Sequence, residues 1–330
     1  MFLNVFLIHT NHQLHQVSKA VDYFKIHSGT IIIVNFRDNQ EKSVIKQFAE
    51  ERNYKVINID SWVFKDLFMY PFKHREFFKE LYQIKNRSKD INLFVSQYLN
   101  DSTLIANNIL KPEVFYLMDE GTASILYSGI REKNNEGKLK ILVKSMIYGK
   151  LLSFPKSLTY FTKYNLKISK NTDAVIKYKE VKVNNRIVKT EEHQVYYLGS
   201  ILVEMGFVEK LNYLAFLNDI LQIYSNKEIY YIPHRAECSL KLRDIEELGY
   251  ILKKIHVPFE MWFEAQKSIP SELASHYYAT VLGNLVDLFQ NLPKITAFDS
   301  PKLKSSQGND IAHKIYLNLK DKDCITFIEL

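Results

Sequence analysis

Strand-length runs of apolar residues alternate along the first third of the chain with segments that have helical hydrophobic spacing. The apolar runs occupy residues 2–8, 30–35, 54–59, 91–96 and 114–118. The helical segments between them occupy residues 16–27, 38–52, 73–85 and 102–110, and a polar loop is expected at 9–15. Strands that alternate with helices form a parallel sheet covered on both faces. The sequence therefore predicts an α/β fold that begins with a Rossmann-like domain.

A second α/β series begins near residue 194. Its expected strands are residues 194–199, 228–233, 250–255, 294–298 and 325–328. Its expected helices are residues 207–224, 243–249, 275–290 and 309–316. We interpret the polar segment 170–189 as the crossing, and predict an N-terminal domain at 1–185 and a C-terminal domain at 186–330. Two α/β units in tandem predict two facing Rossmann-like domains with a central cleft.

The composition narrows the class of protein. A chain of 330 residues with 46% apolar residues can form two domains with cores of their own and is not disordered. The two cysteines, Cys238 and Cys324, have no metal-type or disulfide-framework spacing, which predicts a cytoplasmic location. We expect no secretory signal and no transmembrane segment, because no apolar run approaches the roughly 20 residues that span a bilayer.

The formal net charge of +7 predicts attraction to polyanions, which include nucleic acid, anionic membranes and phosphorylated small molecules. The 21 tyrosines and 21 phenylalanines are spread along the chain and form no RNA-binding or zinc-finger pattern, so we expect no nucleic-acid partner. Residues 132–164 combine lysines with apolar residues at helical spacing. Such a stretch can make peripheral contact with the inner face of the cytoplasmic membrane, or it can be a solvated helix face.

The strand at 114–118 delivers two adjacent carboxylates, Asp119 and Glu120, which Gly121 follows. In open α/β sheets ligands bind outside the carboxyl ends of the strands, so an acid there can face a substrate. The alternative is a strand-to-helix turn in which one acid caps the next helix.

The second domain repeats this arrangement, because the strand at 228–233 delivers Pro233, His234 and Arg235 at its end. The histidine can hold a phosphate by a hydrogen bond or a proton, and the arginine by its charged fork. A lone histidine is more often structural. Set against Asp119 across a cleft, however, His234 supplies the second half of an acid/base pair.

Three further features of the second domain fit a nucleotide site. Gly199 and Ser200 end a strand, where a glycine lets backbone amides approach a ligand. Glu260 can accept hydrogen bonds from ribose hydroxyls, or it is a surface acid. Ser275 and His276 are expected to open a helix whose N-terminal amides bind an anion, with a plain serine N-cap as the alternative.

Several other chemistries lack their markers. His9, His12 and His15 could bind a metal only from a loop, and no HExxH-type helix is present, so we expect no metal site. The chain has no GxGxxG, no Walker A loop and no GxSxG elbow. These absences argue against dinucleotide oxidoreduction, P-loop phosphoryl transfer and α/β-hydrolase chemistry.

The set of motifs resembles the bacterial sialyltransferases, and is most similar to the lipooligosaccharide sialyltransferases of glycosyltransferase family 52. The resemblance rests on Asp119-Glu120-Gly121, on Pro233-His234-Arg235 and on the later serine at Ser275. The runs 197–204, 230–237, 258–260 and 275–285 follow that family's C-terminal half in order and spacing, so the likeness covers roughly residues 110–290.

The resemblance implies a two-domain GT-B glycosyltransferase that works with inversion, without a metal and without a cofactor. The donor would be CMP-sialic acid or a related CMP-nonulosonate, bound by the C-terminal domain. Asp119 would be the general base on the acceptor hydroxyl, with Glu120 as a support or a rival. His234 would stabilise or protonate the leaving CMP phosphate, Ser275 would bind that phosphate, and Gly199 and Glu260 would hold the nucleotide.

The sequence departs from the family pattern at two positions. Arg235 stands where proline is often found, and His276 stands where a second serine is expected. A different register places the hydroxyl motif at Ala279-Thr280, so Ser275 and Thr280 are alternative phosphate ligands. These differences allow a nonulosonate other than sialic acid. Ser200, Pro233, Arg235 and His276 complete the expected donor site.

The acceptor implied by the resemblance is a surface glycan, in lipooligosaccharide or capsule, that ends in galactose. We expect it to meet the first domain, and assign Asn11, His12 and Gly121 to acceptor binding. Oligomeric state is open, with a homodimer as one alternative. The rival interpretations are a transferase that uses another nucleotide sugar and a basic protein that binds polyanions.

Overall fold

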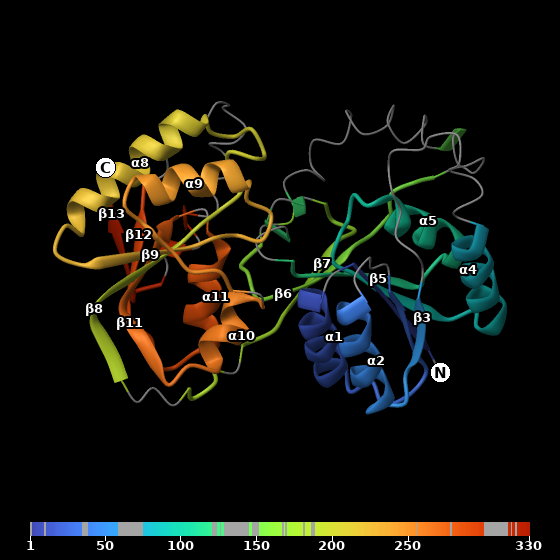
Figure 1. The fold of residues 1–330 in the computed structure, drawn as a ribbon. Coiled ribbons are helices and arrows are strands. Elements are labelled where there is room, and N and C mark those ends of the chain that lie inside the picture. The colour runs from blue at the N-terminus through green and yellow to red at the C-terminus, as the bar shows by residue number, and fades with distance from the viewer. Residues whose placement is uncertain are drawn as a thin grey trace. The chain divides into compact units, whose positions relative to one another are not determined.

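The computed structural model divides the chain into two compact units, Met1–Lys179 and Glu180–Leu330, each with its own sheet (Figure 1). The sequence-based boundary lies between residues 185 and 186. The structure describes residues 2–9, 11–34, 39–58, 75–120, 124–125, 127–128, 145–146, 152–166, 168, 170–180, 182–185, 189–255, 257–277, 279–299, 316–317, 319–320 and 322–330, with the backbone alone at 11–12 and 39–44.

In the described part of the first unit, seven parallel strands form one sheet in the order β3-β2-β1-β4-β5-β6-β7. The strands are β1 (Leu3–Ile8), β2 (Thr30–Val34), β3 (Lys55–Asn58), β4 (Ile91–Val95), β5 (Val114–Met118), β6 (Thr159–Thr162) and β7 (Ala174–Lys177). The helices are α1 (Asn11–Phe24), α2 (Asn39–Glu50), α4 (Arg75–Arg87) and α5 (Asp101–Leu110).

Each strand of this sheet contributes alternate residues to two cores. Val5 and Leu7 of β1 pack with α4 and α5, whereas Phe6 and Ile8 pack with α1 and α2. Figure 1 shows these two helix pairs on opposite sides of the sheet. A strand buried on both faces reads as a continuous apolar run, which is why β1, β2, β4 and β5 were predictable from sequence.

The expected loop at residues 9–15 was wrong, because α1 already begins at Asn11. Leu14 and Val17 are buried and begin the apolar stripe of this helix. The Gln13 side chain accepts a hydrogen bond from the backbone N–H of His9 at 2.6 Å, in the manner of a capping residue that reaches back to the helix start. Polar residues in the first turn therefore belong to the helix.

In the described part of the second unit, six parallel strands form a sheet in the order β10-β9-β8-β11-β12-β13. The strands are β8 (Lys189–Leu198), β9 (Glu228–Ile232), β10 (Ile251–Leu252), β11 (Ser268–His276), β12 (Lys294–Phe298) and β13 (Ile325–Ile328). The helices are α8 (Lys210–Ile223), α9 (Ser239–Glu247), α10 (Phe259–Glu264) and α11 (Thr280–Leu288). Helices α8 and α9 cover one face, and α10 and α11 cover the other (Figure 1).

The helix expected at 275–290 was wrong in its first part. Ser275 and His276 end β11, a central strand that pairs with both β8 and β12, and the helix begins at Thr280. The strand escaped detection because it carries Pro270 and Glu272 among its buried residues. The register shifts between these two residues, and the Glu272 carboxylate accepts hydrogen bonds from the Tyr224 hydroxyl at 2.5 Å and from Thr296.

Strands β6 and β7 were not predicted, since they lie in the segments interpreted as a basic helix and as the domain crossing. Most of the basic stretch 132–164 and the helix expected at 309–316 lie outside the described residues. Among the described helices, none combines the length and the apolarity needed to cross a bilayer.

Both sheets reverse their strand order at a central pair, β1 and β4 in the first unit and β8 and β11 in the second. In each case the chain builds outward on one side of the first strand and then crosses to the other side. In such sheets ligands bind at this reversal, outside the carboxyl ends of the strands. The residues that follow β1, β4, β5, β8, β9 and β11 are therefore the candidates for a functional site.

Candidate functional site

Asp119 follows β5 and is almost completely buried, with 1% of its surface exposed. Its Oδ1 accepts a hydrogen bond from the Ser124 hydroxyl at 2.5 Å. Its Oδ2 accepts one from the Lys163 backbone N–H at 2.8 Å and one from the Tyr178 hydroxyl at 3.0 Å. Burial raises the pKa of Asp119, and these hydrogen bonds oppose the shift. Because Lys163 follows β6 and Tyr178 follows β7, Asp119 ties together the ends of three adjacent strands.

Glu120 has a different environment and is only half-buried. Its Oε1 accepts hydrogen bonds from two side-chain amides, Nε2 of Gln13 at 2.7 Å and Nε2 of Gln97 at 3.2 Å. Gln13 lies in α1, directly after β1, and Gln97 follows β4, so the two donors come from the strands that flank the reversal. The carboxylate of Glu120 is thus held at the position where a ligand of this sheet is expected.

His9 directly follows β1 and is linked through Ser102 and Asn100 to Gln97, one of the two amides that hold Glu120. Its Nε2 lies 3.1 Å from the hydroxyl of Ser102, and that hydroxyl donates to Oδ1 of Asn100 at 2.8 Å. Asn100 Nδ2 in turn donates to Oε1 of Gln97 at 2.8 Å. Burial lowers the pKa of His9 to about 4, so the imidazole is neutral at pH 7.

Two of the three predicted acceptor residues lie at the carboxyl edge of this sheet. Asn11 and His12 are the first residues of α1, which follows β1 at the reversal. Gly121 lies outside the described residues. Assignment of the three to acceptor binding stays a prediction.

In the second unit, His234 is an exposed residue in the turn between β9 and α9. Its Nδ1 accepts a hydrogen bond from the backbone N–H of Ala236 at 3.2 Å. Partial desolvation by the surrounding chain lowers the pKa of His234, and the positive charge of Arg235 lowers it further. An imidazole that is neutral and accepts at Nδ1 carries its proton on Nε2, so this nitrogen is a hydrogen-bond donor.

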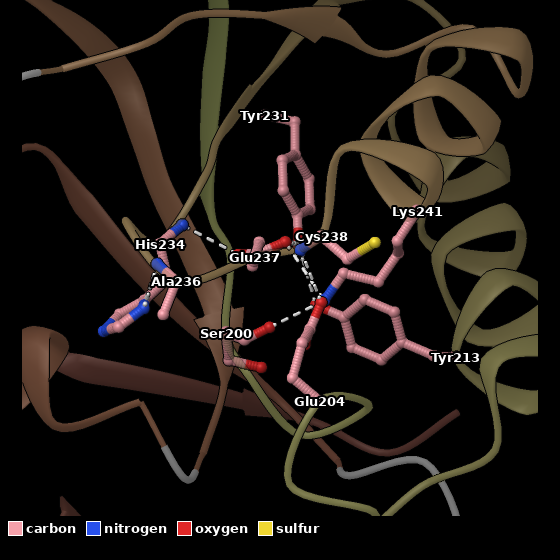
Figure 2. Close-up of polar contacts among 9 residues, drawn as sticks. All are labelled: Ser200, Glu204, Tyr213, Tyr231, His234, Ala236, Glu237, Cys238 and Lys241. Carbon is pink, nitrogen blue, oxygen red and sulfur yellow. Dashed lines mark hydrogen bonds and ion pairs between the residues drawn. The ribbon is translucent and has the colours of Figure 1, made fainter. Parts of the chain in front are cut away.

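A buried ion cluster lies behind this turn (Figure 2). Lys241 of α9 is 2% exposed, and its ammonium contacts the Ser200 carbonyl at 2.9 Å, Glu204 Oε2 at 2.9 Å and Glu237 Oε2 at 3.1 Å. Glu237 Oε1 accepts the backbone N–H of His234 at 2.7 Å, and Oε2 accepts the Tyr231 hydroxyl at 2.9 Å. In Figure 2 the His234 ring points away from the cluster.

Gly199 follows β8 at the reversal, and its missing side chain leaves room for this cluster. A Cβ at this position would lie 2.4 Å from Oε1 of Glu237 and 2.5 Å from the hydroxyl oxygen of Tyr231. The sequence-based interpretation was a glycine that lets a ligand approach. The structure adds that the protein's own carboxylate occupies the space beside its Cα.

The two alternative phosphate ligands lie in different surroundings. Ser275 is fully buried in β11, and its hydroxyl donates to the Leu198 carbonyl at 2.6 Å. His276 is also buried, and burial lowers its pKa to about 3. Thr280 is half-buried and opens α11, whose N-cap residue Ala279 makes no side-chain hydrogen bond. The N-cap position of α11 therefore offers no side chain that would compete with an anion for the first-turn amides.

The remaining predicted donor residues also follow strands of this sheet. Pro233 is half-buried and Arg235 is exposed in the turn after β9, and the Ser200 carbonyl is held by Lys241. Glu260 lies in the first turn of α10, and its Oε1 accepts a hydrogen bond from Nδ2 of Asn284 at 2.8 Å. Among the described residues, no group of three or more metal-ligating side chains could hold a metal ion. Metal independence stays a prediction.

Sequence reasoning missed the residues that support these side chains. Gln13 and Gln97 carry no sequence signal, because amides that hold a carboxylate have no fixed spacing. Glu237 and Lys241 did offer one, since an acid and a lysine four residues apart at a helix start can pair on one face. Glu204 pairs with Lys241 across 37 positions, which sequence does not reveal.

The comparisons with solved structures concern the fold. The chain is similar to UGT89C1 of Arabidopsis thaliana complexed with UDP-L-rhamnose, with a TM-score of 0.52, 8% identity and coverage of 100% of this chain and 86% of that one. It is similar to Anabaena HepE in complex with UDP and glucose, with a TM-score of 0.51, 9% identity and coverage of 97% and 90%.

A third likeness is to Phytolacca americana UGT2 complexed with UDP-2fluoro-glucose and pterostilbene, with a TM-score of 0.50, 8% identity and coverage of 99% and 85%. No family model and no curated protein matches the chain. The expected α/β fold of the GT-B type, with two Rossmann-like domains, is confirmed by these likenesses and by the two parallel sheets.

Proposed function

We propose that the protein is an inverting, metal-independent glycosyltransferase that moves sialic acid or a related nonulosonate from its CMP donor to a hydroxyl of a surface glycan. The acceptor is a lipooligosaccharide or capsule chain that ends in galactose. The observation that carries the proposal is that each Rossmann-like unit holds one of the two groups beside its own strand reversal, Glu120 in the first unit and His234 with Arg235 in the second. An acid and a neutral histidine are the two groups that this transfer needs.

On the donor side, His234 stabilises the leaving CMP. As the bond between the anomeric carbon and the phosphate oxygen breaks, negative charge develops on that oxygen. The Nε2–H of His234 donates to it, while Arg235 and the amides at the start of α11 add positive potential. We assign the hydroxyl that binds the phosphate to Thr280. Two observations support this choice: Thr280 is the first residue of α11, and the Ser275 hydroxyl already donates to the Leu198 carbonyl.

On the acceptor side, we assign the proton acceptor to Glu120. The attacking hydroxyl gives its proton to this carboxylate as the oxygen bonds to the anomeric carbon from the face opposite to CMP. Two observations support Glu120 over Asp119. Glu120 is more exposed, and the hydrogen bonds that it accepts from described residues all go to Oε1, so none of them engages Oε2. Asp119 receives hydrogen bonds on both oxygens and serves to fix the strand end from which Glu120 projects.

The test is incubation with CMP-sialic acid and a galactose-terminated acceptor, followed by mass spectrometry of the acceptor. An added nonulosonate mass supports the proposal, and it should also appear in the presence of EDTA. Loss of the product in EDTA, with recovery on addition of magnesium or manganese, would count against metal independence. Release of CMP without added mass would establish donor hydrolysis alone.

A transferase that uses a UDP-sugar is the second candidate. It is favoured by the solved structures of similar fold that contain UDP or UDP-sugars. The two candidates differ in which nucleotide stabilises the folded protein most, because at equal concentration the ligand that binds more tightly raises the melting temperature further. A larger rise with CMP than with UDP or GDP supports the nonulosonate transferase, and the reverse order supports the second candidate.

A further inference from the structure

We propose that Glu237 and Lys241 are positioning residues that hold the loop after β8 and the turn after β9 together as one donor-binding surface. The inference rests on the proposed function, since it concerns the same nucleotide site. Neither residue was assigned a role from the sequence. Both side chains point into the buried ion cluster, and the His234 ring points away from it (Figure 2).

Lys241 is unavailable to a ligand because its own protein satisfies it. An ammonium group has three N–H donors, and Lys241 has three acceptors at 2.9, 2.9 and 3.1 Å. Two of them, the Ser200 carbonyl and Glu204, belong to the segment that follows β8. The third, Glu237, belongs to the turn that follows β9. One buried cation thus connects two separate strand ends.

Glu237 fixes the backbone of His234 from two directions. Its side chain accepts the backbone N–H of His234 at 2.7 Å, and its own backbone N–H donates to the His234 carbonyl at 2.9 Å. Because one residue holds both backbone groups of His234, the turn is restrained at the residue from which the imidazole projects. The orientation of a catalytic side chain depends on such contacts from residues that do not themselves touch the substrate.

The connection between the two strand ends is tightly packed against Gly199. The Glu237 carboxylate lies so close that a Cβ at Gly199 would be only 2.4 Å from it. A path of short contacts therefore runs from the strand reversal at Gly199 and Ser200, through Lys241 and Glu237, to His234. A displacement at either end should be transmitted to the other, because the Lys241 and Glu237 side chains are buried and their contacts are already at hydrogen-bond distance.

The same unit contains a matched cluster that serves as a control. Glu272 is also a buried carboxylate, and it too pairs with a tyrosine hydroxyl, of Tyr224 at 2.5 Å, and a lysine, Lys294 at 3.2 Å. Lys294 is the first residue of β12, so this cluster lies toward the amino edge of the sheet. Breaking it should lower stability without touching the donor surface.

The experiment compares Glu237→Gln and Lys241→Met with Glu272→Gln in the full chain. Affinity for CMP is measured by calorimetry, and the KM for CMP-sialic acid and kcat are measured with saturating acceptor. We expect both test variants to weaken CMP binding and to raise the donor KM by about tenfold or more, with a smaller fall in kcat. Glu272→Gln should lower the melting temperature and leave the CMP affinity unchanged.

Two results would overturn the inference. One is CMP affinity equal to that of the wild type in folded Glu237→Gln and Lys241→Met. The other is an equal loss of affinity in Glu272→Gln, which would mean that the clusters act through stability alone. If a variant does not fold, Tyr231→Phe replaces it, because this change removes one hydrogen bond to Glu237 and no charge. A wild-type protein that binds none of CMP, UDP and GDP refutes the proposed function itself.

Discussion

Asp119 and Glu120 are consecutive residues, yet their carboxyl groups lie in opposite environments. Asp119 is 1% exposed and accepts hydrogen bonds on both oxygens, whereas Glu120 is half-buried and is held on one oxygen by two side-chain amides. Successive residues after a strand point in different directions, so one acid enters the structure while the other faces the reversal of strand order. The two carboxylates should therefore respond differently to the same amide substitution.

Glu120→Gln should abolish transfer with little effect on folding, because an amide cannot take the proton of the acceptor hydroxyl. Asp119→Asn should lower the free energy of unfolding by about 1–3 kcal/mol, since it brings an amide donor against buried donors. Thermal unfolding and initial rates measured on both variants check this prediction. A folded, fully stable Asp119→Asn that is inactive would return the role of base to Asp119.

Gly199→Ala should weaken nucleotide binding, because the new Cβ would displace the Glu237 carboxylate or the Tyr231 hydroxyl. Gly206→Ala is the matched control. Gly206 has a φ of +72° and nothing within 4 Å of an added Cβ, so this change should cost about 1–2 kcal/mol of backbone strain and displace no neighbouring side chain. Calorimetric titration with CMP should show reduced affinity for the first variant alone. Equal affinities would separate Gly199 from the donor site.

Ser275→Ala and Thr280→Val decide between the two candidate phosphate ligands. Ser275→Ala removes a buried hydrogen bond to the Leu198 carbonyl, and should lower stability by about 1 kcal/mol with CMP affinity unchanged. Thr280→Val keeps the shape of the side chain but removes the hydroxyl at the start of α11, and should weaken CMP binding. The opposite pattern would restore Ser275 as the phosphate ligand.

Much of the fold could be predicted from the sequence, because strands buried on both faces are apolar throughout. The exceptions have physical causes in particular residues. β11 carries Glu272 and Ser275 in its interior, and each is satisfied by partners more than 20 positions away, Thr296 and Leu198. A pattern based on local hydrophobicity cannot include such partners, so the strand was missed and its last two residues, Ser275 and His276, were predicted to start a helix.

The candidate site was predictable at the level of strand ends but not of side-chain roles. Sequence placed acids after β5 and a histidine after β9, since both follow recognisable apolar runs. It could not distinguish Asp119 from Glu120, because burial depends on Tyr178 and Gln13, which are distant in the chain. For the same reason the contact between Lys241 and Glu204, which are 37 positions apart, had no local signal.

His276 should make the protein less stable in acid. Burial, followed by the charge of Lys241, lowers its pKa from 6.5 to about 3. Between these values the unfolded chain binds a proton that the folded protein does not, so stability is full above pH 6.5 and falls with decreasing pH. The loss between pH 7 and pH 5 should be about 2 kcal/mol from this residue.

Urea unfolding of the wild type and of His276→Gln at pH 7 and pH 5 measures this contribution. The variant should lose about 2 kcal/mol less than the wild type over this interval, with a remaining dependence from His9, whose pKa burial lowers to about 4. His193→Gln, a change at an exposed histidine, should behave as the wild type does. An unaltered pH dependence in His276→Gln would mean that His276 is protonated in the folded protein.

Arg235 should determine selectivity for a donor sugar that carries a carboxylate. The residue is exposed beside His234, and it forms no ion pair with any other residue that the structure describes. A nonulosonate has a carboxylate on its anomeric carbon, next to the phosphate, and the planar guanidinium can bind such a group with two parallel hydrogen bonds.

Arg235→Lys keeps the charge but loses this geometry. It should raise the KM for CMP-sialic acid by about tenfold and leave the affinity for CMP alone nearly unchanged. An equal loss of affinity for both compounds would place the guanidinium on the phosphate, and no change for either would leave Arg235 outside the donor site.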